Sequence, residues 1–152
     1  MTAVLSLGSN VGDRLAMLRL AVELLQPERV SSVWETAPIG GVPQDDFLNA
    51  VVLVEVSAAA AWQRAVAAET AAGRTRELRW GPRTLDVDVI WATGSDPGLT
   101  LPHPRAFERG FVLLPWLEVD PAAMLPGHGP VALLPAALDP AGLRRRPDLA
   151  LR

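Results

Sequence analysis

Short apolar runs alternate with longer segments of helical periodicity in the first half of the chain. Residues 2–7 are mostly apolar and end at a Gly-Ser-Asn turn, which predicts a strand. Over residues 13–25 leucine and valine recur at helical spacing until Pro27, which predicts a helix. Residues 30–36 predict a second strand, and the β-branched residues of 47–56 predict a third.

The second half of the chain continues this alternation. Ser57 predicts the N-cap of an alanine-rich helix, and Gly73 predicts its end. Residues 83–91 alternate between apolar and polar positions, which predicts a fourth strand. One face of that strand would carry Leu85, Val87, Val89 and Trp91, and the other Asp86, Asp88 and Ile90. Residues 99–101 are a candidate edge strand, and residues 107–114 predict a short helix that ends near Pro115.

The order of the main elements is β-α-β-β-α-β, which predicts an α+β, ferredoxin-like fold with an antiparallel sheet and helices on one face. We expect a single domain over residues 1–152, with its core motifs in 1–121 and a segment rich in Pro and Gly wrapping the surface over 122–152. Two predicted loops, 37–46 and 74–82, are long for a compact domain, and such loops are often functional.

Composition narrows the class of protein. Apolar residues make up 49% of the chain, which excludes a disordered protein, and the absence of cysteine excludes disulfides and thiolate metal sites. The net charge of −3 argues against a general nucleic-acid binder. No apolar run is long enough for a membrane span, and the first residues predict a strand rather than a signal peptide. We therefore expect a soluble, cytoplasmic protein.

A pair of aspartates stands out in the predicted fourth strand. Asp86 and Asp88 are two residues apart, so both carboxylates project from the same face and repel each other. Divalent cations would compensate this charge, and two Mg²⁺ ions about 3.5–4 Å apart can hold the attacking and leaving oxygens of a transfer reaction. Two solvent-facing aspartates on an exposed sheet would have the same pattern, and the pair alone does not decide between these interpretations.

Arginines cluster just before this pair. All 14 positive side chains of the protein are arginine, for which codon bias is a sufficient reason, but their positions are not random. The loop and the strand that follows it contain Arg74, Arg76, Arg79 and Arg83. Guanidinium groups bind phosphate through paired hydrogen bonds, so these residues fit a polyphosphate site. Surface salt bridges with Glu77, Asp86 and Asp88 are the alternative. Trp80 would cover a planar ligand or pack on the core.

The remaining candidates are weaker. A phosphate-binding P-loop is impossible without lysine, and residues 8–12 indicate a tight turn first and a binding loop second. His103 lies between two prolines, and with Arg105 and Arg109 nearby a structural role competes with a phosphate contact. His128 and the Arg144-Arg145-Arg146 run are interpreted as surface and as a solvated tail, respectively.

Four segments together resemble the hydroxymethyldihydropterin pyrophosphokinases. They are residues 7–13, 35–50, 73–88 and 101–112, in order and at compatible spacing between about residues 3 and 121. The string Arg-Trp-Gly-Pro-Arg-Thr-Leu-Asp-Val-Asp at 79–88 is the most specific of them. The departures are Ala37, where many members have proline, Phe47, where some have tyrosine, and Glu77, which puts a negative charge near phosphate.

The resemblance implies a reaction and a set of site residues. The reaction is attack of the pterin hydroxymethyl oxygen on the β-phosphorus of ATP, with AMP leaving, and Glu69 would brace the arginines. The implied catalytic residues are Arg74, Arg83, Asp86 and Asp88, of which Asp86 and Asp88 would hold two Mg²⁺ ions. The implied ATP-binding residues are Arg74, Arg76, Arg79, Trp80, Arg83, Val89, Thr100, His103 and Arg109. The implied pterin-binding residues are Thr36, Ala37, Ile39, Phe47, Asn49, Trp80 and Phe111.

Two other classes of protein share parts of this pattern. Polymerase-palm and cyclase-type enzymes also carry paired aspartates on a ferredoxin-like sheet, but Phe47, Asn49 and Phe111 would have no purpose there. RNA-recognition modules share the order of elements, but they place aromatic and basic residues where this sheet carries Asp86 and Asp88. We therefore expect ATP and the pterin as partners, no nucleic acid, no membrane, and a monomer.

Overall fold

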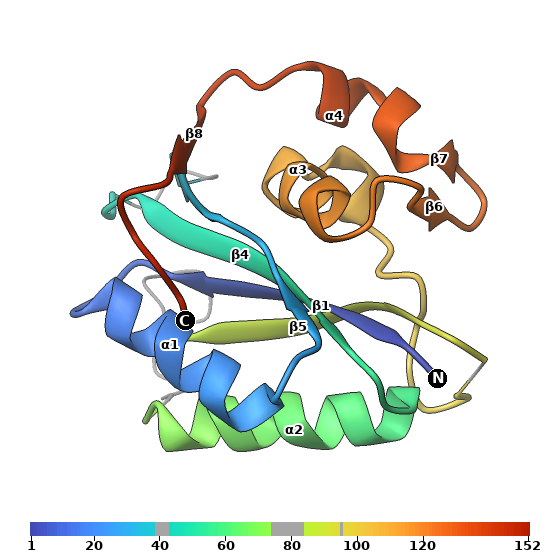
Figure 1. The fold of residues 1–152 in the computed structure, drawn as a ribbon, viewed down its shortest axis with the longest axis horizontal. Coiled ribbons are helices and arrows are strands. Elements are labelled where there is room, and N and C mark those ends of the chain that lie inside the picture. Colours follow the sequence, from blue (N-terminus) through green and yellow to red (C-terminus); the bar gives the residue numbers. More distant parts are fainter. Residues whose placement is uncertain (39–42, 74–83, 95) are drawn as a thin grey trace.

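A six-stranded antiparallel sheet organises the described part of the molecule. The computed structural model describes residues 1–38, 43–73, 84–94 and 96–152 (Figure 1). The strands along the sheet are, in order, β5 (Asp86–Ala92), β1 (Ala3–Ser9), β4 (Phe47–Val54), β3 (Val33–Thr36) and β8 (Leu143–Arg146). The short strand β2 (Arg29–Val30) also pairs with β4. The order of β5, β1, β4 and β3 confirms the predicted α+β, ferredoxin-like fold.

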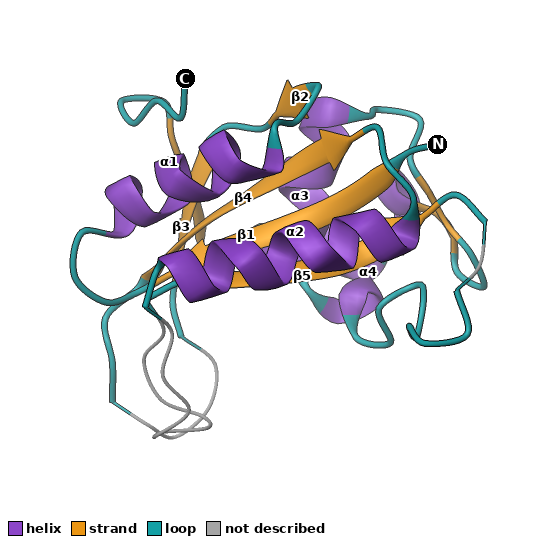
Figure 2. Cartoon of the chain, turned by 90° about the horizontal axis from the view of Figure 1, so that it is seen from below, coloured by secondary structure: helices purple, strands orange, loops and turns teal. Residues whose placement is uncertain are grey.

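Two helices cover one face of the sheet. They are α1 (Arg14–Leu25) and α2 (Ala58–Ala71), which lie side by side in front of the strands in Figure 2. The Asp13 carboxylate accepts a hydrogen bond from the Ala16 amide at the start of α1, and the Ser57 hydroxyl accepts one from the Ala60 amide at the start of α2. Because these caps satisfy amides that have no partner within the helix, they define where each helix begins, as predicted for Ser57.

The prediction of helices on only one face was wrong. Helix α3 (Gly110–Val119) packs on the opposite face of the sheet, as Figure 1 shows. It continues past Pro115, where the sequence predicted its end, because three of the helix's own side chains, Leu113, Trp116 and Val119, are buried. That apolar contact outweighs the backbone hydrogen bond that proline cannot donate.

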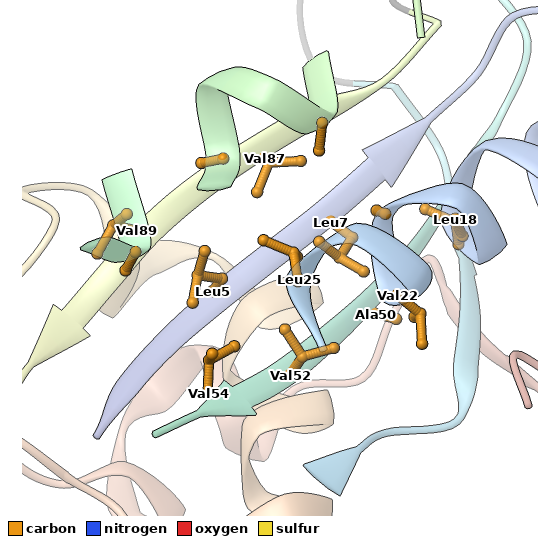
Figure 3. Packing of buried hydrophobic residues seen from close by; sticks show 14 of the residues in the cluster. Leu5, Leu7, Leu18, Val22, Leu25, Ala50, Val52, Val54, Val87 and Val89 are labelled. Atoms are coloured by element: carbon orange, nitrogen blue, oxygen red, sulfur yellow. The ribbon is translucent and has the colours of Figure 1, made fainter. Parts of the chain in front are cut away.

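Each face of the sheet has its own apolar core. Between the sheet and α1 and α2, side chains such as Leu5, Leu7 and Leu25 are fully buried (Figure 3). On the α3 side the core includes Val4, Ile90 and Trp116. Strand β1 supplies both cores because its alternate residues point to opposite faces.

A β-bulge in β5 changes the side on which Trp91 lies. Leu5 pairs with Val89, but the preceding residue Val4 pairs with Trp91, so Ile90 is an extra residue in β5. Val89 therefore stays in the core under the two helices, whereas Ile90 and Trp91 both contact the core on the α3 side. The prediction that Trp91 shares a face with Val87 and Val89 was wrong, because a bulge interrupts the alternation on which it rested.

Two further strand predictions need correction. Residues 30–36 form two strands, not one, because Ser31 interrupts the run: its hydroxyl accepts a hydrogen bond from the Val51 amide and donates one to the Ser32 carbonyl. Residues 99–101 form no strand in the described structure. They belong to the connection that leads to His103, whose amide donates to the Ile90 carbonyl at the end of β5.

The C-terminal segment does more than wrap the surface. It forms β6 (Met124–Leu125), β7 (Gly129–Pro130), the 3-10 helix η2 (Val131–Leu133) and α4 (Pro135–Leu138) before it reaches β8. The interpretation of Arg144 to Arg146 as a solvated tail was wrong, because these residues form β8 and pair with β3. Beyond β8 the chain ends against α1, where Leu151 is buried.

Candidate active site

The strand register brings the predicted pterin and metal residues onto one surface. Asn49 pairs with Gly8, Gly8 pairs with Asp86, and Ser6 pairs with Asp88. Cross-strand partners point to the same face, and so do residues two apart in a strand, so all of these side chains lie on the α3 side of the sheet. We call this surface the site face; it comprises Ser6, Gly8, Thr36, Phe47, Asn49, Asp86 and Asp88.

One half of the site face carries the predicted pterin residues. The Asn49 side-chain nitrogen donates a hydrogen bond to the Thr36 hydroxyl at 2.7 Å, and both residues are buried. The Asn49 oxygen lies over Gly8, since a β-carbon built on Gly8 would be 3.0 Å from it and 3.7 Å from the Phe47 ring. The absence of a side chain at Gly8 therefore makes room for Asn49 and Phe47. The sequence analysis did not single out this role of Gly8.

The other half carries the paired aspartates. Asp86 is half-buried and Asp88 is exposed. The amide between them, that of Val87, donates a 3.0 Å hydrogen bond to the Glu69 carboxylate on α2. Because β5 is at the edge of the sheet, this amide faces outward, and Glu69 holds the strand in place between the two carboxylates.

The donor set fits magnesium. Among the described residues, no three His, Cys, Asp or Glu side chains are grouped closely enough to enclose a metal. Two carboxylates on one face leave coordination positions for phosphate oxygens and water, which is how Mg²⁺ is usually held in enzymes that use nucleotides. Asp86 and Asp88 would therefore bind the ion together with its substrate.

His103 and Arg109 lie between β5 and α3, and Phe111 is the second residue of α3. Burial lowers the pKa of His103, although the negative charge of Asp88 opposes this effect, so the ring favours its neutral form. Its Nδ1 accepts a hydrogen bond from the Arg105 amide at 3.2 Å. The Arg109 guanidinium carbon is 5.7 Å from the centre of the Phe111 ring, within cation–π range. His128 is exposed, as predicted, and its ring stacks on Phe107.

The remaining predicted residues differ in their placement. Ala37 and Thr100 are exposed, and the Val89 side chain is buried under the helices, so only its backbone could meet a nucleotide. Several predicted residues lie outside the described part of the chain: Ile39, Arg74, Arg76, Arg79, Trp80 and Arg83.

Two side chains, one in the turn before α1 and one at its start, hold the loop that leads to Phe47, and the sequence did not predict this role. The Asn10 amide nitrogen donates to the Gln44 side chain at 2.6 Å and to the Asp45 carbonyl at 3.2 Å. An Arg14 nitrogen, Nη1, donates to the Asp46 carbonyl at 2.9 Å. Both tie the chain that enters β4 at Phe47 to the turn after β1. The Gly-Ser-Asn turn at residues 8–10 hinted at a special role for Asn10. Its hydrogen-bond partners Gln44 and Asp45 could not be predicted, because they are more than 30 residues away in the sequence.

The sequence model of the 7,8-dihydro-6-hydroxymethylpterin-pyrophosphokinase family matches residues 4–121. The chain belongs to this family. A pyrophosphokinase of this kind, named 2-amino-4-hydroxy-6-hydroxymethyldihydropteridine pyrophosphokinase, occurs in Mycobacterium bovis and is 46% identical over 91% of this chain and 84% of the relative. Proteins with the same name in Mycobacterium leprae and Methylorubrum extorquens are 50% and 43% identical over 80% and 94% of this chain, and over 73% and 97% of their own length.

Membership of the pyrophosphokinase family confirms the predicted activity class. The protein is a transferase of folate biosynthesis that moves pyrophosphate from ATP to the hydroxymethyl group of the dihydropterin. The alternative, another two-metal nucleotidyl transferase, is not favoured. None of the helices in the described ranges combines the length and hydropathy that a membrane span requires.

Proposed function

We propose that the site face performs this transfer by holding the pterin over Gly8 and the triphosphate of ATP over Asp86 and Asp88. The observation that supports this arrangement is the register Asn49–Gly8–Asp86 across three neighbouring strands. Neighbouring strands are about 4.8 Å apart, so an acceptor hydroxymethyl group on one half would lie within a few ångströms of phosphates on the other. Such proximity is most of what phosphoryl-type transfer requires.

The pterin half suits a flat heterocycle with a polar edge. Phe47 and Phe111 would stack on the ring faces, and Thr36 and Asn49 would meet the donors and acceptors of the ring edge. Ala37 and Ile39 would contribute through their backbone, and Trp80 would cover the ring. Because the Asn49 amide is already oriented by Thr36, its carbonyl oxygen is held ready to accept from a ring N–H.

The metal half would hold two Mg²⁺ ions on the Asp86 and Asp88 carboxylates. When bound, these ions would neutralise charge on the β- and γ-phosphates and help to align attacking and leaving oxygens. By accepting the hydrogen bond of the Val87 amide, Glu69 would hold the edge strand β5 in position relative to α2, and with it the two carboxylates.

The nucleotide would be bound mainly by arginine. His103 lies close enough to feel the charges of both Asp88 and Arg109. His103 and Arg109 would contact the triphosphate, while Thr100 and the backbone of Val89 would contact the rest of ATP. Arg74 and Arg83 would stabilise the transferring group, and Arg76 and Arg79 would bind phosphates from the same segment. The pterin hydroxyl releases its proton as its oxygen bonds to the β-phosphorus. The bond between that phosphorus and the oxygen shared with the α-phosphate breaks, and AMP leaves with the shared oxygen. No covalent protein intermediate is involved.

One copy of the chain is sufficient for this arrangement, because the described site residues come from a single sheet, from the loops that follow β3 and β5, and from the start of α3. We therefore also propose that the protein acts as a monomer, without nucleic acid or membrane as a partner. A cytoplasmic location agrees with the use of ATP as the donor.

The decisive experiment measures AMP formation from ATP and Mg²⁺, with and without 6-hydroxymethyl-7,8-dihydropterin. Wild type should form AMP only with the pterin, and Asp88→Ala should lose at least about 100-fold of this rate, as expected when charge stabilisation in the transition state is removed. Glu23→Ala, which removes an exposed carboxylate from α1, is the matched control and should keep full activity. Pterin-dependent AMP formation that is equal in Asp88→Ala and wild type would refute the metal assignment.

A further inference from the structure

Strand β8 lies beyond residue 121, where the match to the family ends, yet it is an integral strand of the sheet. It pairs with β3 over Val33 to Thr36, the strand that carries Thr36 onto the site face. We propose that β8 is a positioning element for the pterin half of the active site, acting through Glu35 on one face of the sheet and through Gly110 on the other. This inference rests on the proposed function of the site face.

On the face under α1, three arginines converge on one carboxylate. Arg144 and Arg146 of β8 both donate hydrogen bonds to the Glu35 carboxylate, the second at 3.3 Å. Arg14 of α1 donates to its other oxygen at 3.2 Å. The Glu35 side chain is only 11% exposed, so solvent screens its pairs with the partly buried Arg14 and Arg146 less than its pair with Arg144, which is 69% exposed. We call these four residues the Glu35 cluster.

The Glu35 cluster reaches both strands that carry pterin residues. Glu35 directly precedes Thr36 in β3. The Arg14 nitrogen that contacts Glu35 also donates to the carbonyl of Asp46, the residue before Phe47 in β4. The cluster therefore joins β8 and α1 to the end of β3 and the start of β4, immediately beneath Thr36 and Phe47.

On the opposite face, β8 supports the start of α3. Leu143 pairs with Thr36, so its side chain lies on the α3 side. A β-carbon built on Gly110 would be 2.7 Å from a Leu143 methyl carbon and 3.0 Å from the Ala136 carbonyl oxygen. Gly110 thus allows Leu143 and α3 to approach closely. Because Gly110 lies between Arg109 and Phe111, Leu143 supports the turn that places the predicted stacking ring.

Charge keeps the cluster assembled at neutral pH. Burial by itself raises the pKa of the Glu35 carboxyl, but the hydrogen bonds from Arg144 and Arg14 and the positive charges of Arg144 and Arg146 together hold this pKa below its ordinary value. Arg146 is further held by Asp148, whose carboxylate accepts two of its hydrogen bonds at 3.0 and 2.8 Å. Arg146 is therefore held between two carboxylates, and Arg144, although 69% exposed, pairs with Glu35.

The test compares two double variants that remove the same charge. Arg144→Ala with Arg146→Ala removes the contacts of β8 with Glu35. Arg19→Ala with Arg152→Ala is the matched control, because these arginines donate to the carbonyls of Ala150 and Pro27 and tether the C-terminal end without touching Glu35. For each variant one measures KM for the pterin, KM for ATP, kcat and the midpoint of thermal unfolding.

We expect the first double variant to raise KM for the pterin about fivefold, since about 1 kcal/mol of lost positioning has that effect, with KM for ATP within twofold. The control double variant should leave both constants unchanged. Arg144→Lys with Arg146→Lys, which keeps the charge, should recover most of the loss. Leu143→Ala tests the contact between β8 and Gly110 by the same measurements. It replaces the Arg144→Ala, Arg146→Ala variant if that variant does not fold.

An unchanged KM for the pterin in a folded variant would overturn the inference. So would an equal rise of both KM values, which indicates a general structural role. Neither result affects the proposed function. The proposed function would be refuted only if wild type itself formed no pterin-dependent AMP.

Discussion

The side-chain nitrogen of Asn49 donates a 2.7 Å hydrogen bond to the hydroxyl of Thr36, and the two residues come from neighbouring strands and are buried together. This bond orients the amide, so that its nitrogen faces β3 and its oxygen lies over Gly8 on β1. Three neighbouring strands thereby define the orientation of the Asn49 side chain. This orientation decides which groups at the edge of a ligand its amide can hydrogen-bond.

Thr36→Val should weaken pterin binding without affecting ATP. The valine has nearly the same shape as threonine but leaves the Asn49 N–H without its acceptor, which should cost about 1–3 kcal/mol of folding stability. The freed amide should raise KM for the pterin, while KM for ATP stays constant. Steady-state kinetics and denaturant unfolding measure both effects, and Thr70→Val on the exposed side of α2 is the control. Unaltered pterin kinetics in a destabilised variant would argue against this role of Thr36.

Gly8→Ala should have a similar effect by crowding. The added methyl group would lie 3.0 Å from the Asn49 oxygen, closer than ordinary contact, and Asn49 is held in place by Thr36. We expect about 1–3 kcal/mol of destabilisation, as for other overpacked sites, together with a higher KM for the pterin. Gly98→Ala, whose methyl group would lie 3.2 Å from an Asp96 oxygen on an exposed turn, should change neither quantity. A normal KM in Gly8→Ala would mean that ligand and Asn49 do not meet above this residue.

Glu69→Ala should impair the use of magnesium although Glu69 is not placed among its ligands. The Val87 amide would lose its 3.0 Å acceptor, and the edge strand that carries Asp86 and Asp88 would lose its support. Loss of such outer support commonly costs about 10- to 100-fold in metal affinity or activity. The Mg²⁺ concentration for half-maximal AMP formation should therefore rise. Glu69→Gln, which keeps an acceptor oxygen, should lose less; an unshifted Mg²⁺ dependence in Glu69→Ala would exclude this role.

Folding stability should depend on pH through Glu35. Its pKa in the folded protein lies below its ordinary value, so the unfolded chain binds the proton more readily. The stabilisation is therefore complete above the unfolded pKa of about 4.3 and is lost as the pH falls through the folded pKa. Denaturant unfolding of wild type and Glu35→Gln should show a difference in the free energy of unfolding at pH 7 that shrinks below about pH 4.3. A difference that is constant over this range would contradict the argument.

The local part of the site could be predicted because it follows from strand periodicity. Asp86 and Asp88 must share a face in any regular strand, and that face is the one the structure assigns to them. The specific string that contains them also identified the family, which the comparisons confirmed. The same periodicity failed at Trp91, because one extra residue in β5 reverses the alternation and leaves no mark in the composition of the strand.

The sequence by itself determined the elements, their order and the chemical types of the site residues, because caps, turns and alternation act over a few neighbouring positions. The tertiary structure alone decided what lies across from what: Gly8 beneath Asn49, Glu69 at the Val87 amide, and β8 beside β3. These contacts depend on register between segments far apart in the chain. Register is set by the fit of both apolar cores and by the turns at the strand ends, and no local pattern encodes it.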